Sequence, residues 1–164
     1  MQKEEKFSAF GQTVEELEVL SQKLIQTIDN QTKAVIASND KKIEEFAERY
    51  TTLKGSFKEQ EKQFIDQLQD MTPPKDERLK LEHLKETYPQ YGQMIEQWEE
   101  SLGTHTRLLK RKHKKLNELL EFALNRNVEL MHSIYRLHNQ KNTHYSSGGG
   151  REEIASGMAV NKEA

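Results

Sequence analysis

The sequence contains no cysteine among its 164 residues. This excludes disulfide bridges and thiolate metal sites, and it fits a reducing compartment such as the cytoplasm. Apolar residues amount to 34% and charged residues to 32%, against roughly 45–50% and 25% in ordinary globular domains. This composition predicts long helices that each bury one narrow apolar stripe, in place of a thick rounded core.

Long apolar runs are also missing. No window approaches the ~18 apolar residues that a membrane-spanning helix needs, and the charged residues 1–6 are not followed by the apolar segment of a signal peptide. The net charge of −2 provides no general attraction to nucleic acid or to an anionic membrane. We therefore expect a cytoplasmic protein with no nucleic-acid partner and no stable membrane insertion.

Residue groups typical of catalysis or cofactor binding do not occur in the sequence. No predicted strand precedes the glycines at 148–150 and no Gly-Lys-Ser/Thr follows them, so they do not form a phosphate-binding loop. The six histidines include no pair three or four residues apart, the spacing that places two metal ligands on one helix face. We expect no enzymatic activity, no metal and no cofactor. His105 falls on an apolar stripe and is interpreted as a partly buried core residue.

Two helices are predicted before the first prolines, over residues 13–37 and 41–70. Thr13 and Glu16 resemble a capping box at the start of the first helix. Polar residues 38–40 are expected to form the tip of a helical hairpin, with an uninterrupted helix as the alternative. Gly55 lies inside the second helix, where it costs about 1 kcal/mol relative to alanine and would allow another backbone to approach. The prolines at 73 and 74 end that helix.

A short helical turn near residues 79–84 and a third helix over residues 90–140 complete the predicted bundle. At ~1.5 Å per residue the third helix would be about 75 Å long, whereas each of the first two would reach only about 40–45 Å. About 30 Å of apolar stripe near residues 119–139 would then lack a partner within the chain, and such surfaces usually mark binding sites. This inference assumes that the helix does not fold back at Gly103.

The chain is therefore predicted to be all-α: an antiparallel three-helix, coiled-coil-like bundle with a long, protruding C-terminal helix and a disordered tail. Residues 1–141 would form the helical domain, and residues 142–164, rich in glycine and small polar residues, the flexible tail. The basic run at residues 107–115 is interpreted as a solvated helix face. The alternative is a site for nucleic acid or for an acidic partner.

The C-terminal third contains two short motifs, Asn117-Glu118-Leu119-Leu120 and Thr143-His144-Tyr145-Ser146-Ser147-Gly148. The first resembles the asparagine and paired-leucine signature of the FlgN family of flagellar export chaperones, and the second is similar to that family's terminal Thr-x-Tyr-Gly pattern. A serine stands here where the family often has glycine directly after the tyrosine. The first two thirds of the chain resemble the family only in architecture.

The resemblance implies a chaperone that binds the C-terminal amphipathic helices of flagellar hook-associated proteins, which join hook to filament. It implies that the chaperone prevents their premature assembly and delivers them to the flagellar type III export gate. Tyr145 matches the tyrosine implicated in docking on the cytoplasmic domain of that gate. The predicted client-binding residues lie in the long helix: Asn117, Leu119, Leu120, Ala123, Leu124, Asn127, Val128, Met131, Ile134, Tyr135, Leu137 and His138. The alternative function is that of a homodimeric structural coiled-coil protein, in which the same stripe would be closed by a second copy.

Overall fold

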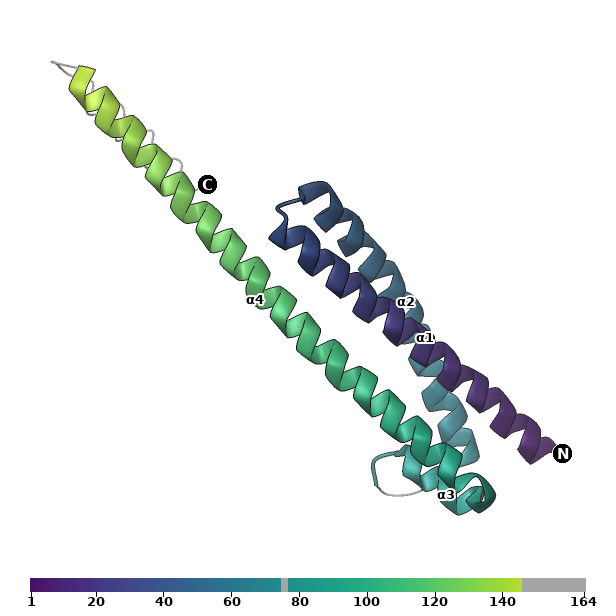
Figure 1. The fold of residues 1–164 in the computed structure, drawn as a ribbon. Coiled ribbons are helices and arrows are strands. Elements are labelled where there is room, and N and C mark those ends of the chain that lie inside the picture. The colour runs from purple at the N-terminus through teal and green to yellow at the C-terminus, as the bar shows by residue number, and fades with distance from the viewer. Residues whose placement is uncertain (75–76, 146–164) are drawn as a thin grey trace. The chain divides into compact units, whose positions relative to one another are not determined.

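The computed structural model describes residues 1–74 and 77–145, with side chains as far as Gln140. Within these ranges all regular structure is helical. The three long helices are α1 (Gln2–Ile36), α2 (Asp40–Met71) and α4 (Gly92–Tyr145) (Figure 1). By its internal contacts the chain divides into two units, Met1–Leu119 and Leu120–Ala164, and α4 contributes residues to both.

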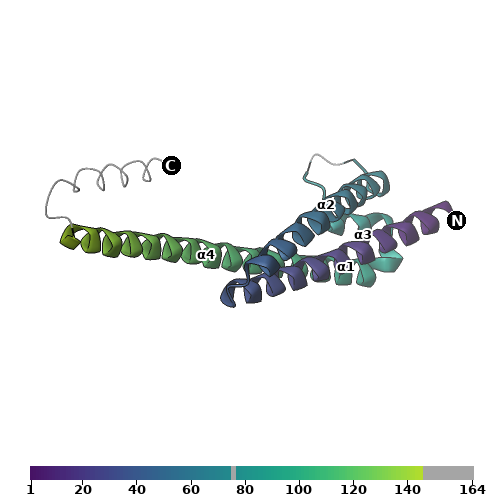
Figure 2. The same ribbon diagram turned by 90° about the horizontal axis from the view of Figure 1, so that it is seen from above.

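The first unit is a three-helix bundle with up-down-up topology. Both ribbon views show α2 returning beside α1 after the hairpin tip (Figures 1 and 2). The rings of Phe7 and Trp98 lie 5.1 Å apart, and Lys112 Nζ donates to Asp29 Oδ1 at 2.5 Å. Residue numbers therefore increase in the same direction along α1 and α4, and α2 runs antiparallel to both. This confirms the predicted all-α class and the three-helix coiled-coil-like arrangement.

The helix α1 begins at Gln2, so the predicted start at Thr13 is wrong. Thr13 is buried inside the helix, and its hydroxyl donates to the carbonyl oxygen of Ala9 at 3.3 Å instead of capping a helix start. The physical reason is the spacing of Phe7 and Phe10, which extends the apolar stripe of Val14 by almost two turns. Both phenylalanines are buried, and this burial favours helix in a segment that has no proline.

The hairpin tip lies where the polar cluster at residues 38–40 predicts it. Ser38 has a positive φ of 53°, a left-handed conformation that reverses the chain after α1. Asn39 is the N-cap of α2, and its side-chain oxygen accepts a hydrogen bond from the backbone N–H of Lys42 at 3.2 Å. The alternative of one uninterrupted helix is therefore excluded.

The connector between α2 and α4 consists of single turns. The predicted turn near residues 79–84 is present as a 3-10 turn, η1 (Leu81–His83), followed by α3 (Leu84–Thr87) and a second 3-10 turn, η2 (Pro89–Tyr91). Pro89 occupies the first turn of η2, where its missing N–H leaves no donor unpaired.

An aromatic cluster forms the core at this end of the bundle. Phe10 lies 5.0 Å from Phe64 of α2 and 5.7 Å from Trp98 of α4, measured between ring centroids. Leu84 and Tyr88 of the connector pack into the same cluster, where both are buried. The helix α1 thus packs between two helices, and its buried residues continue toward the hairpin tip through Leu17, Leu24, Ile28, Ala34 and Val35.

The helix α4 continues through Gly103 without a break and ends at Tyr145, beyond the predicted end at residue 140. The rest of the predicted tail, residues 146–164, lies outside the described residues. None of the described helices combines the length and the apolar character needed to cross a membrane.

Candidate functional site

Most of the exposed large apolar side chains lie in the part of α4 that belongs to the second unit. In this part their exposed fractions range from 39% for Tyr135 to 64% for Leu124. Leu120 and Ala123 are half-buried. We define the candidate face as the apolar residues among 120–138 of α4, namely Leu120, Phe122, Ala123, Leu124, Val128, Leu130, Met131, Ile134, Tyr135 and Leu137.

Most of the client-binding residues predicted from the sequence belong to this segment. Asn127 and His138 are exposed polar residues within it. Asn117 and Leu119 instead belong to the first unit, where Leu119 is half-buried and Asn117 Nδ2 lies 3.3 Å from His113 Nδ1. The structure thus brings ten of the twelve predicted residues together on one described helical segment, 120–138.

Two members of the candidate face were missed by the sequence argument. Phe122 is 61% exposed and Leu130 is 53% exposed. Phe122 lies off the stripe that the spacing of three and four defines, so a search for one stripe passes over it. Leu130 lies on that stripe, four residues before Ile134 and seven before Leu137, and should have been included. The signal that would have found Phe122 is the overall number of large apolar residues in this segment, taken without regard to period.

The chemistry that this face offers is apolar burial combined with helical shape. A single large aliphatic side chain contributes about 1.5–3 kcal/mol when it passes from water into a packed interface. Unbranched Met131 adapts to differently shaped partners. The described residues contain no group of three or more acidic or histidine side chains that could hold a metal ion. Exposed apolar residues at helical spacing therefore suit an amphipathic helix as the partner.

The histidines of the first unit serve local structure. His105 is half-buried, as expected, and its Nδ1 donates to the carbonyl oxygen of Ser101 at 2.8 Å. His83 is buried in the connector, where its Nδ1 accepts the backbone N–H of Lys80 at 3.3 Å.

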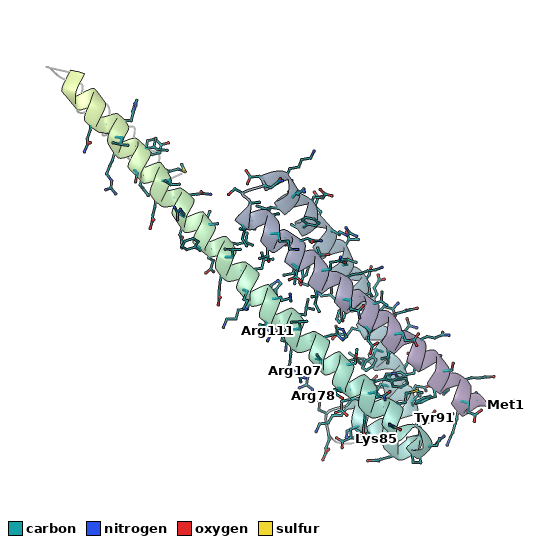
Figure 3. All side chains as sticks on the ribbon, viewed as in Figure 1. Met1, Arg78, Lys85, Tyr91, Arg107 and Arg111 are labelled. Carbon is teal, nitrogen blue, oxygen red and sulfur yellow. The ribbon has the colours of Figure 1, made fainter. Side chains whose placement is uncertain are left out.

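The basic run at residues 107–115 divides between two roles. Lys112 binds Asp29 of α1 and so belongs to the packing of the bundle. Arg107 and Arg111 lie on the side of α4 that is turned away from α1 (Figure 3). Lys114 Nζ lies 3.9 Å from the carboxylate of Glu118, one turn further along the same helix. An exposed ion pair of this kind contributes little to stability.

Tyr145 is the last residue of α4. Its side chain lies outside the described residues, so its predicted role in docking on the export gate stays a prediction.

No protein-family model matches the chain, and neither the curated proteins nor the solved structures include a match. The resemblance to the FlgN family therefore rests on the two segments quoted above and stays a prediction.

Proposed function

We propose that this protein is a cytoplasmic export chaperone for flagellar hook-associated proteins. The observation that supports the proposal most is the exposure of the candidate face, residues 120–138 of α4. The same segment is the one that the resemblance to the FlgN family implies as the client-binding part. The exposed apolar surface and the resemblance thus both support this segment as the client-binding part.

The mechanism is the capping of a helix that would otherwise self-associate. The C-terminal helix of a hook-associated protein is amphipathic, and its apolar side would bind other copies before export. Packing that side against Leu124, Met131 and their neighbours removes both apolar surfaces from water. Loss of translational freedom and the ordering of side chains offset most of this gain, which leaves a complex that can release its client.

The test is co-purification of the full chain with the C-terminal helical segment of a hook-associated protein. The variant Leu124→Ser with Met131→Ser is expected to retain much less of the client while keeping its helical circular dichroism. The matched control is Asn125→Ser with His132→Ser, two exposed polar residues of the same segment, and it is expected to keep the client. Equal retention by both variants, or equal loss, would contradict the proposed site.

Tyr145 is proposed to dock the loaded chaperone on the cytoplasmic domain of the export gate. The variant Tyr145→Ala is then expected to hold the client as well as the unchanged chain does, but to bind the isolated gate domain more weakly. A variant that binds the gate domain normally would remove this part of the proposal and leave the client-binding part intact.

The alternative is a homodimer that closes the candidate face with a second copy. Exposed apolar side chains favour self-association as well as client binding. Light scattering after size exclusion separates the two, because a stable dimer at micromolar concentration would hide the face from a client.

A further inference from the structure

The apolar side chains of the candidate face are spread widely around the helix. With about 100° of rotation per residue, they cover an arc of roughly 240° between residues 120 and 138. One partner helix needs an apolar arc of only about 100°. The remaining arc is entirely polar and consists of Glu121, Asn125, Glu129, His132 and Arg136, whereas the polar residues Arg126, Asn127, Ser133 and His138 lie among the apolar ones.

Two groups of residues within this arc point in different directions. The first group, here called the seam face, contains Leu120, Leu124 and Met131. The second group, here called the second face, contains Phe122, Leu130 and Leu137, which are 61%, 53% and 61% exposed. By helix geometry the centres of the two faces are separated by roughly 100–130°. A single straight helix seated on the seam face would therefore leave much of the second face in water.

The helix α1 shows how buried residues are distributed around a helix that has two neighbouring helices in this protein. It packs against two helices, through Phe10 onto Phe64 of α2 and through Phe7 onto Trp98 of α4. Its buried residues cover about half of its circumference. They include neighbours in sequence, as a helix with two partners requires: Thr13 with Val14, Thr27 with Ile28, and Ala34 with Val35.

The candidate face also contains such neighbours in sequence, and here both members of each pair are apolar. Its pairs are Ala123 with Leu124, Leu130 with Met131, and Ile134 with Tyr135. All of these side chains except that of Ala123 are exposed, whereas the corresponding pairs of α1 are buried between two helices. The apolar arc of this segment is wider than the arc over which α1 is buried, so it offers room for two helical neighbours.

We infer that the candidate face takes two amphipathic helices of its client side by side, one on the seam face and one on the second face. This inference rests on the proposed function and deepens it by specifying how the client is held. A charged residue of the segment also predicts a property of the client helix that binds the second face. Arg126 lies within the second face, one turn from both Phe122 and Leu130, and it is exposed. The helix seated there carries a carboxylate opposite this guanidinium.

The test uses a synthetic peptide of the C-terminal amphipathic helix of a hook-associated protein, titrated into the full chain. Native mass spectrometry and calorimetry count the bound peptides. Two peptides per chain are expected at saturation. The variant Phe122→Ser with Leu130→Ser is expected to bind one, and the variant Leu124→Ser with Met131→Ser is also expected to bind no more than one. The control Asn125→Ser with His132→Ser is expected to bind two.

The charge is tested with a matched pair of arginines in the same segment. Arg126→Ala is expected to weaken the second binding step several-fold when the peptide carries a carboxylate, about the size of one charge pair at an interface rim. Arg136→Ala, which changes the polar arc, is expected to leave both steps unchanged.

The outcomes separate the two proposals. A single bound peptide that the Phe122→Ser, Leu130→Ser variant retains with unchanged affinity would overturn the two-helix inference and leave the chaperone function standing. A chain dimer that takes up one peptide per chain would overturn it as well, because the second neighbour would then be a second copy. Absence of any binding would overturn both.

Discussion

Two leucines of this chain differ in environment and allow a direct comparison of core and candidate face. Leu24 is 2% exposed inside the first unit, and Leu124 is 64% exposed in the second. Truncation of Leu24 to alanine leaves a cavity and is expected to lower the free energy of unfolding by roughly 2–5 kcal/mol. Truncation of Leu124 removes few contacts, so its effect is expected to stay within about 0.5 kcal/mol.

The assay is urea unfolding of the full chain, followed by circular dichroism at helical wavelengths. With an unchanged slope, Leu24→Ala shifts the midpoint to lower urea, whereas Leu124→Ala leaves it in place. In thermal unfolding the loss at Leu24 corresponds to a fall in Tm on the order of 10 °C.

A large loss of stability in Leu124→Ala would refute this reasoning. It would mean that the side chain is part of a packed core in solution. The dependence of the midpoint on protein concentration would then identify the cause, because a homodimer becomes more stable as its concentration rises. A midpoint that does not depend on concentration would instead indicate a core formed within one chain.

Three further predictions concern single positions. Gly55 is exposed and no atom lies within 4 Å of the place that an alanine Cβ would occupy, so Gly55→Ala is expected to raise the free energy of unfolding by about 1 kcal/mol. In Gly11→Ala the new Cβ would lie 3.3 Å from the Trp98 ring, and this close contact is expected to cancel the gain. The urea midpoints of the two variants test the difference. Ser38 has a φ of 53°, so Ser38→Gly is expected to raise the free energy of unfolding by about 0.5–1 kcal/mol in the same assay. Burial raises the pKa of the Tyr50 hydroxyl above its usual 10.0. The contribution of this group to stability is therefore complete below about pH 10 and is lost as the pH rises further. Because phenylalanine does not ionise, Tyr50→Phe is expected to reduce the fall in Tm at alkaline pH.

The sequence predicts the path of the chain well wherever a residue acts through its own backbone. The two adjacent prolines place the end of α2 and the polar cluster at 38–40 places the tip, because proline and N-cap residues act locally. The expectation that Gly55 admits another backbone is wrong for the part of the chain that the structure describes, because no atom of another element lies within 4 Å of the place that its Cβ would occupy.

Prediction fails where a tertiary contact decides the structure. The segment before Thr13 is helical because Phe7 stacks against Tyr91 at 4.2 Å and against Trp98, partners more than 80 residues away. A capping box is a local signal, and burial of two phenylalanines outweighs it. The candidate face was found only in part for a related reason. A single-stripe search assumes one neighbour per helix, and Phe122, which lies off the stripe, does not obey that assumption.

The apolar arc of α4 is wider in its exposed part than in the part that is packed in the bundle. Within the first unit, where α4 contacts both α1 and α2, the apolar residues from Met94 to Leu119 cover an arc of roughly 140°. Between residues 120 and 138 the arc widens to roughly 240°. A helix that remained in water would need a narrower stripe, because wide exposed apolar surfaces promote aggregation. The widening therefore supports the proposal that this segment works in contact with other helices, and its exposure is what we expect of the proposed chaperone without its client.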